Sequence, residues 1–330
     1  MRCMVSYSAK GKYKYCRKSK KQMKKTTISV IGFFALILAA CSLNGNSAKG
    51  NDEQGRQKME QSSAVQTNGD ILSDEGDETM ENKSEQGTTE NLSGADAELS
   101  TKGMEIPAPL KDRSEQIIQH NGYTLSYNKS HNTANWSAWE LTAKEAEGEL
   151  PRKNKFWADP NIETAYRVDW YEYKGSGYDR GHLCPAADMK WSEDAMHDCF
   201  YMSNICPQEP RLNGGAWKKL EEECRNWALR KKAIYIVCGP VYKKGKHEQI
   251  GIDHAIDVPE GFFKVVLSIK KGNEKAIGFY YENTPRKQPM IKAATSVDCI
   301  EELTGIDFFP SLPDSLEKAL ESRFSFAEWK

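Results

Sequence analysis

Residues 178–189 read YDRGHLCPAADM, and this stretch carries most of the information about fold and chemistry. Two further stretches follow, SNICPQ at 203–208 and LNGGAWKKLE at 212–221. Hydrolysis of a phosphodiester requires an activated water, and a neutral histidine is a suitable base near pH 7. Arginine suits phosphate oxygens through its planar fork, and Mg²⁺ prefers a few oxygen ligands with several retained waters. His182, Arg225 and Asn213 are the right residue types for these tasks.

The spacing of the third stretch predicts that its polar residues act together. Each four-residue step along a helix drifts by only about 40°. A helix that begins near Asn213 would therefore place Asn213, Trp217, Glu221 and Arg225 on one slowly turning strip. Three alternatives stay open on spacing alone. Asn213 could only cap the helix, Glu221 and Arg225 could form a solvated pair, and residues 179–182 could form a turn around a satisfied core histidine.

The rest of the domain mixes strand and helix patterns. Residues 122–127 alternate as a strand, and residues 136–141 look like its partner across a turn containing Asn132 and Asn135. Further strands are expected at 233–238, 262–269 and 276–281, and helices at 213–232 and 313–323. This mixture predicts an α+β domain with a central, largely antiparallel sheet flanked by helices.

The three stretches together resemble the DNA/RNA non-specific endonucleases, a family of ββα-metal nucleases. The tetrapeptide 179–182 matches the family's defining motif, and the other two stretches follow in the family's order. Residues 297–310, VDCIEELTGIDFFP, resemble the family's C-terminal segment, so that the similarity spans roughly 119–323. The resemblance implies a ββα-metal nuclease fold. It also implies a metal-dependent, sequence-nonspecific endonuclease with DNA and RNA as substrates.

Roles for the central residues follow from this resemblance. His182 would be the general base that deprotonates water. Asn213 would be the single direct protein ligand of one hydrated Mg²⁺ ion, for which Mn²⁺ could substitute. Glu221 would hold water of that ion, and Arg225 would contact the phosphate.

The resemblance is less specific for the surrounding residues. Arg152 looks like the family's upstream phosphate-binding arginine, and Arg167 is its competitor. Asp179 and Arg180 would orient the site, with a simple salt bridge as the alternative. Asn204 would support the site from behind it.

The first 105 residues differ in charge from the remainder. Residues 1–41 carry ten Lys or Arg and no acidic residue, residues 42–105 carry a net charge of −9, and residues 106–330 carry −2. Many nucleic-acid-binding domains are basic, and this one is not. Residues 42–105 are polar and lack aromatic residues, so we expect a disordered acidic linker before a nuclease domain at 106–330.

An export signal is expected at 1–41, behind a basic N-terminus, with Met1 or Met23 as the start. The apolar run 28–40 spans about 20 Å as a helix, short of the roughly 30 Å hydrocarbon core. The residues LAAC at 38–41 resemble a bacterial lipobox, and an ordinary secretory signal is the alternative. We therefore expect lipid on Cys41 and an exported protein anchored to a membrane, either periplasmic or at the cell surface.

The chain has nine cysteines, and six of them lie in the domain: Cys184, Cys199, Cys206, Cys224, Cys238 and Cys299. None belongs to a C-x-x-C pair, which makes a zinc site unexpected. Export would favour one or more disulfides. Cys184 and Cys206 stand beside the predicted site, where they could pair locally or act as small apolar fillers.

Two other functions are compatible with this sequence. A phosphodiesterase for small nucleotides could use the same scaffold, and a closed pocket would favour it. A surface lipoprotein could bind nucleic acid without cutting it, but the intact His182 and Asn213 argue against that. No particular protein partner is indicated.

Overall fold

The computed structural model of the chain describes residues 101–330. The expected signal segment, the lipidation site Cys41 and almost all of the expected linker lie outside the described residues. Met104 is fully buried, so the packed domain includes residues just before position 106. Within 101–330, no helix has the length and apolar character needed to cross a membrane.

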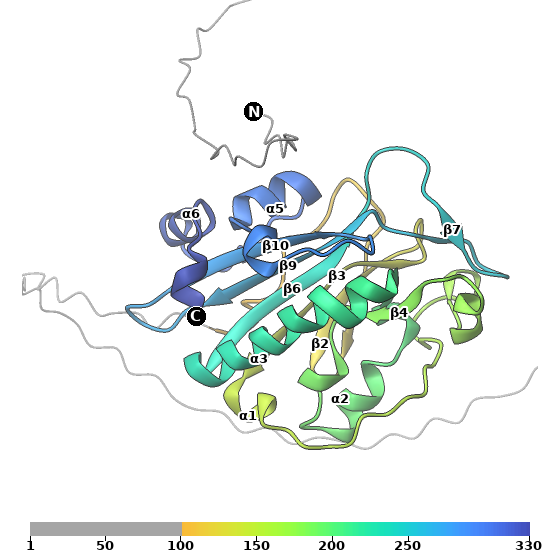
Figure 1. The fold of residues 1–330 in the computed structure, drawn as a ribbon, viewed down its shortest axis with the longest axis horizontal. Coiled ribbons are helices and arrows are strands. Elements are labelled where there is room, and N and C mark those ends of the chain that lie inside the picture. Colours follow the sequence, from red (N-terminus) through yellow and green to blue (C-terminus); the bar gives the residue numbers. More distant parts are fainter. Residues whose placement is uncertain (1–100) are drawn as a thin grey trace, which may run out of the picture. The chain divides into compact units, whose positions relative to one another are not determined.

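The domain is built on one seven-stranded sheet in which each pair of neighbours is antiparallel (Figure 1). The strand order is β1-β2-β3-β6-β9-β10-β11. These strands are β1 (Gln116–His120), β2 (Tyr123–Asn128), β3 (Thr133–Thr142), β6 (Ala233–Val241), β9 (Gly261–Ser268), β10 (Lys275–Glu282) and β11 (Ala294–Thr295). Two small ribbons add β4 (Asp179–His182) with β5 (Ile205–Gln208), and β7 (Gln249–Ile250) with β8 (Ile256–Asp257).

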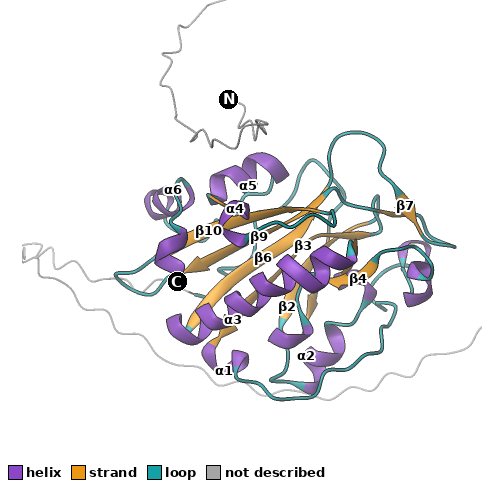
Figure 2. Ribbon diagram, viewed as in Figure 1, coloured by secondary structure: helices purple, strands orange, loops and turns teal. Residues whose placement is uncertain are grey.

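Helices cover both faces of this sheet (Figure 2). Successive side chains of a strand point to opposite faces, and in β6 Ile236 and Val237 accordingly belong to two different hydrophobic cores. The first core includes residues of α3 (Lys218–Lys231), and the second includes residues of α5 (Val297–Thr304) and α6 (Asp314–Glu321). Three shorter helices complete the domain, namely α1 (Ala143–Ala146), α2 (Glu193–Asp198) and α4 (Met290–Ala293).

The mixed, largely antiparallel architecture expected from the sequence is confirmed. All five expected strands are present as β2, β3, β6, β9 and β10, with ends shifted by a few residues. The turn between β2 and β3 differs from the prediction. Only Asn132 lies in it, with a φ of 53°, whereas Asn135 lies inside β3 and its amide donates to Ser126 Oγ.

The ribbon β4–β5 and the helix after it form the ββα unit. Gly181 allows the two strands to pack closely, because a Cβ at this position would collide with the buried side chain of Gln208. The helix expected at 213–232 begins instead as a π-helical segment, Leu212–Trp217, and continues as α3. Such π-helical turns occur frequently at functional sites.

The expected disulfides are not found among the core cysteines. Cys184, Cys199, Cys206, Cys224 and Cys238 are buried free thiols. All five belong to the first hydrophobic core, where each fills the volume of a small apolar side chain. Cys184 and Cys206 are therefore fillers rather than a local pair.

Candidate active site

His182 ends strand β4 and is 8% exposed. Its ring lies between two phenylalanines, with ring centroids 4.9 Å from Phe200 and 5.5 Å from Phe156. Burial, reinforced by the positive charges of Arg152 and Arg180, lowers the pKa of His182 to about 3. The Nε2 atom is buried and has no hydrogen-bond partner among the described residues. His182 is thus a neutral imidazole with an unused nitrogen, not the satisfied core histidine of the alternative reading.

The two arginines beside His182 rest on the same aromatic rings. The guanidinium carbon of Arg180 lies 4.5 Å from the centroid of the Phe156 ring, and that of Arg152 lies 5.2 Å from the Phe200 ring. Arg167 instead donates to Thr164 Oγ1 at 2.9 Å. The positive charge of Arg152 also acts on the pKa of His182, and Arg167 is not among the groups that do so.

Asn213 is joined directly to the motif strand. Its Nδ2 donates to Asp179 Oδ2 at 2.9 Å, and its Oδ1 has no hydrogen-bond partner among the described residues. The side chain makes no capping bond, because the π-helical segment is capped by Arg211 without a side-chain hydrogen bond. The N-cap reading is therefore wrong. Asp179 contacts Asn213 rather than Arg180, so the two motif residues do not form the salt bridge considered as an alternative.

Arg225 lies in an ion pair that the sequence analysis missed. Its Nη1 donates to Asp188 Oδ1 at 2.8 Å, and Trp139 Nε1 donates to Asp188 Oδ2 at 3.2 Å. The Asp188 side chain is 1% exposed and that of Arg225 is 18% exposed. Arg225 is therefore not part of a solvated pair with Glu221. One edge of its guanidinium is held by Asp188.

Glu221 is a half-buried carboxylate in the same charge cluster. Loss of solvent raises the pKa of Glu221 to about 7, and the neighbouring Asp188 acts in the same direction. Lys264 is the cation that opposes this shift most, followed by Arg225 and Arg152. No hydrogen bond satisfies the Glu221 carboxylate within residues 101–330.

Lys264 is a buried lysine that sequence reasoning also missed. It lies on β9 at 1% exposure, with Nζ 4.8 Å from the Trp217 ring centroid and 4.9 Å from that of Trp139. Burial alone would lower the pKa of Lys264, but nearby thiols and the carboxylates of Glu221 and Asp188 raise it overall. The sequence signal for it was a single lysine inside the otherwise apolar run 262–267. A lysine is almost never fully buried unless it is paired, so its place in a buried strand would have indicated charged partners nearby.

Asn204 holds the chain that follows His182. Its Oδ1 accepts from the Cys184 amide at 2.9 Å, and its Nδ2 donates to the carbonyls of Cys184 and Cys199 at 2.8 and 2.9 Å. Its own carbonyl accepts from the Leu183 amide at 3.0 Å. Asn204 is fully buried, and its hydrogen bonds hold the segment that follows the motif strand.

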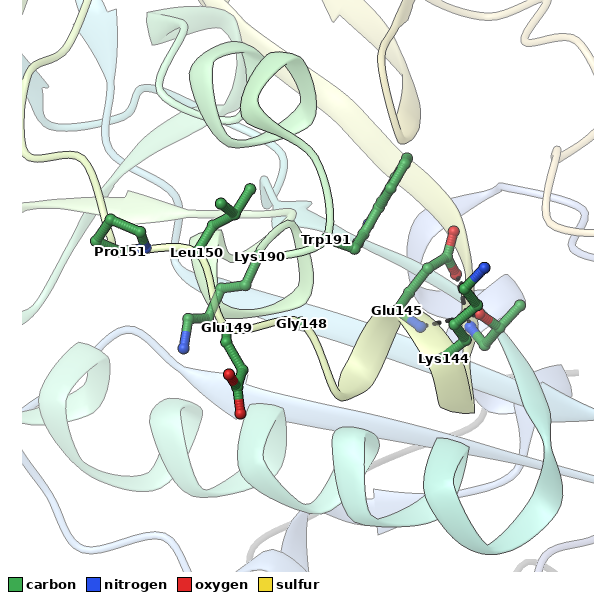
Figure 3. A pocket seen from close by; sticks show the side chains of 9 residues that line it. Lys144, Glu145, Gly148, Glu149, Leu150, Pro151, Lys190 and Trp191 are labelled. Atoms are coloured by element: carbon green, nitrogen blue, oxygen red, sulfur yellow. Dashed lines mark hydrogen bonds between the residues drawn. The ribbon is translucent and has the colours of Figure 1, made fainter.

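Two surface hollows flank the domain without including the site. The larger, about 760 Å³, has α1 with Lys144 and Glu145 at one end and Pro151 at the other (Figure 3). The smaller, about 490 Å³, is lined by residues that include His120 and Tyr201. Neither contains His182 or Asn213, so neither is the closed pocket that would favour a small nucleotide.

The residues around Asn213 fit a hard divalent cation. Asp179 holds the amide so that Nδ2 is occupied and the oxygen is the atom left for a ligand. The Glu221 carboxylate lacks a hydrogen bond. Its pKa is raised because burial removes the solvent that would stabilise its negative charge. Mg²⁺ prefers a small number of protein oxygens together with water. An amide oxygen and an unsatisfied carboxylate are donors of that kind.

The fold and this arrangement define the class of protein as a ββα-metal nuclease, in which a two-stranded ribbon and the following helix carry the site. The solved structure of an EndoG/EndoGI complex matches with a TM-score of 0.58 at 26% identity. The match covers 60% of this chain and 87% of that chain.

Sequence comparisons identify the family. The family model for DNA/RNA non-specific endonucleases matches residues 100–315. The chain is 35% identical over 237 residues to the mitochondrial nuclease EXOG of Xenopus laevis, covering 65% of each protein. It is 34% identical over 218 residues to a nuclease of Nostoc sp., covering 63% of this chain and 78% of that protein. The chain therefore belongs to the DNA/RNA non-specific endonuclease family.

The chain is also similar to a human mitochondrial nuclease. Endonuclease G of human mitochondria is 31% identical over 228 residues, which cover 65% of this chain and 74% of that protein. The match to the Xenopus laevis nuclease spans just under two thirds of that relative's length.

Proposed function

We propose that the protein is a metal-dependent endonuclease that hydrolyses phosphodiester bonds in DNA and RNA without sequence specificity. The observation that carries the proposal is the neutral imidazole of His182 beside Arg152 and Arg180, two arginines that have no carboxylate partner within the described residues. A neutral imidazole can accept a proton from water, and such arginines can bind phosphate oxygens.

His182 would act as the general base. In the free protein its pKa of about 3 keeps it neutral at every physiological pH, but makes it a weak acceptor. Arg152 and Arg180 contribute to that low value, and a bound phosphate would neutralise both of them. Substrate binding should therefore raise the pKa of His182 toward the range in which it accepts a proton. The base would gain strength only when the phosphate is in place.

Asn213 and Glu221 would hold the ion, Asn213 directly through Oδ1 and Glu221 through water. When bound, Mg²⁺ would neutralise charge on the phosphate oxygens. Asp179 would keep the amide of Asn213 in the orientation that exposes its oxygen. Because an amide is a neutral ligand, the protein alone should bind the ion weakly, and nucleic acid should strengthen the binding.

The phosphate would be contacted mainly by Arg152 and Arg180. Arg225 would contribute its remaining donors, since Asp188 already accepts from Nη1. A phosphodiesterase for small nucleotides is the second candidate. It is less favoured because the similar proteins in Xenopus laevis, Nostoc sp. and human mitochondria are nucleases. As a further part of the proposal, lipid on Cys41 would tether the exported enzyme to a membrane.

The deciding experiment compares Asn213→Ala with Asn226→Ala, an exposed asparagine on the same helix. Each purified protein is incubated with plasmid DNA and with RNA across a Mg²⁺ titration, with chelator as the blank. We expect the wild type and Asn226→Ala to cut both polymers in a Mg²⁺-dependent way, and Asn213→Ala to lose cleavage and metal response together. Full cleavage by Asn213→Ala at saturating Mg²⁺ would show that Asn213 is not the metal ligand. Cleavage of only small diesters by the wild type would favour the second candidate.

A further inference from the structure

Three potential metal ligands meet where the β2–β3 turn contacts the β7–β8 ribbon, through the bond from the Asp257 amide to the His131 carbonyl. His131 lies in the turn, His247 lies in the loop after β6, and Asp257 ends β8. One ligand atom from each residue lies within 4.8 Å of the other two. The hydrogen bonds and ring contacts of these residues go to groups outside the candidate active site, and the proposed endonuclease function uses none of the three.

Hydrogen bonds within and around the cluster hold its three side chains. His131 Nδ1 lies 2.6 Å from Asp257 Oδ2, and the other oxygen, Oδ1, accepts from Gln249 Nε2 at 2.8 Å. His247 Nδ1 lies 2.9 Å from Glu260 Oε1. In His247, the Glu260 carboxylate that accepts the Nδ1 proton fixes the imidazole tautomer and leaves Nε2 as a lone-pair donor. This is the usual support for a metal-binding histidine.

Aromatic packing holds the two imidazoles in place. The rings of His131 and Tyr242 are stacked with centroids 4.0 Å apart, and His247 meets the same tyrosine edge-on at 5.2 Å. The side chains are shielded, with exposures of 24% for His131, 9% for His247 and 10% for Asp257. The cluster is therefore prearranged, and it remains open enough on the His131 side for an ion to enter.

We propose that His131, His247 and Asp257 form a second metal site, for a divalent ion of the Zn²⁺ type. Two imidazole nitrogens and one carboxylate suit Zn²⁺, whereas Mg²⁺ prefers oxygen ligands. The ion replaces the proton shared by His131 and Asp257. Tetrahedral ligands about 2.0–2.1 Å from zinc lie roughly 3.4 Å apart, so ligand atoms that lie within 4.8 Å of one another need to change their separations by at most about 1.4 Å. The charges of Asp257 and Glu260 balance the dication. The site contains no cysteine, which is why the cysteine spacing gave no sign of it.

Binding at this site would tie three separate segments together. It joins the β2–β3 turn to the loop after β6 and to the β7–β8 ribbon. Glu248, which follows His247, accepts from the Tyr178 hydroxyl at 2.9 Å, and its carbonyl accepts from Val258 at 2.8 Å. Tyr178 immediately precedes the motif strand β4. The ion would thus stabilise the loop that packs against the entry to that strand.

The test measures Zn²⁺ content and melting temperature of the full-length protein. Metal-free protein is dialysed against Zn²⁺, and bound zinc is counted by elemental analysis for the wild type, for His131→Gln/His247→Gln and for Glu260→Gln. The matched control is His254→Gln, because His254 also pairs with a carboxylate, Glu172, but belongs to no three-ligand cluster. Asn213→Ala separates this site from the proposed catalytic ion.

The wild type, His254→Gln and Asn213→Ala should each retain one Zn²⁺ that the double variant lacks. Zn²⁺ should raise the melting temperature of these three proteins but not that of the double variant, because an ion that binds only the folded state stabilises it. Glu260→Gln should weaken zinc binding about 10–100-fold. Equal zinc content in the wild type and the double variant, or loss of the same zinc in Asn213→Ala, would overturn the proposal. The proposal would also be overturned if Glu260→Gln bound zinc with wild-type affinity and the His131→Gln/His247→Gln variant kept its full zinc content.

Discussion

Replacing His182 by asparagine should remove a specific dependence of stability on pH. In the folded protein, burial and two neighbouring arginines hold the pKa of His182 near 3, whereas an unfolded histidine titrates near 6.5. Below pH 6.5 the unfolded chain therefore takes up a proton that the folded protein does not bind. The folded state loses stability as the pH falls from 6.5 toward 3, and His182 has no such effect above 6.5.

The size of this effect follows from the two pKa values. Each pH unit inside the window costs up to about 1.4 kcal/mol, so that the fall from neutral pH to pH 5 costs about 2 kcal/mol. The side chain is 8% exposed, and solvent screening reduces this figure little. Other groups titrate in the same range, but they remain in the variant. The difference between the two proteins isolates His182.

Urea denaturation at pH 7.5 and pH 5.0 measures this difference. The free energy of unfolding of the wild type should fall by about 2 kcal/mol more than that of His182→Asn. Cleavage at pH 7.5 should fall about 10²–10⁴-fold in the variant, as expected for loss of a general base. If both proteins lose the same stability on acidification, His182 titrates normally and the electrostatic account of the site fails. Near wild-type cleavage by His182→Asn would show that His182 is not the general base.

Three further changes test the neighbouring residues. Asp188→Asn should lower the free energy of unfolding by about 3 kcal/mol in urea melts, because it leaves Arg225 without its buried partner; an unchanged melt would show that the pair contributes no stability. Arg152→Ala should reduce kcat/KM on plasmid by about 10²-fold, and Arg167→Ala far less; the reverse order would exchange their roles. Cys41→Ser should release the protein from membranes with its cleavage rate unchanged, and unaltered membrane fractionation would contradict the lipid anchor.

The sheet could be predicted from the sequence because its strands carry strong local signals. The run 233–238 is continuously apolar, and β9 and β10 flank a short polar turn, so their positions were predictable to within a few residues. Strand β4 gave no such signal. It has four residues, Asp179–His182, two of them charged, and it exists because it pairs with β5 and packs against Gln208. That pairing is a tertiary effect.

The candidate site was predictable as a set of residue types but not as a set of contacts. The motif order indicated His182 and Asn213, and the structure links Asn213 to the motif through Asp179. The partner of Arg225 could not be inferred, because Asp188 lies 37 residues away and enters the pair only through the fold. The disulfide expectation failed for a similar reason, since the count of cysteines says nothing about which of them line one core.

The near-neutral net charge of the domain is compatible with phosphate binding, because binding depends on the local charge at the site. That local charge depends on which of the cations there are paired with carboxylates. Arg225 is neutralised by Asp188, and Lys264 lies among carboxylates and thiols. Arg152 and Arg180 rest on aromatic rings instead, with no carboxylate partner in residues 101–330. An aromatic face orients a guanidinium without cancelling its charge. Two uncompensated arginines therefore lie beside His182, where the proposed function requires cations to bind phosphate. So few contacts also suit an enzyme, since each additional phosphate contact would slow the release of cut product.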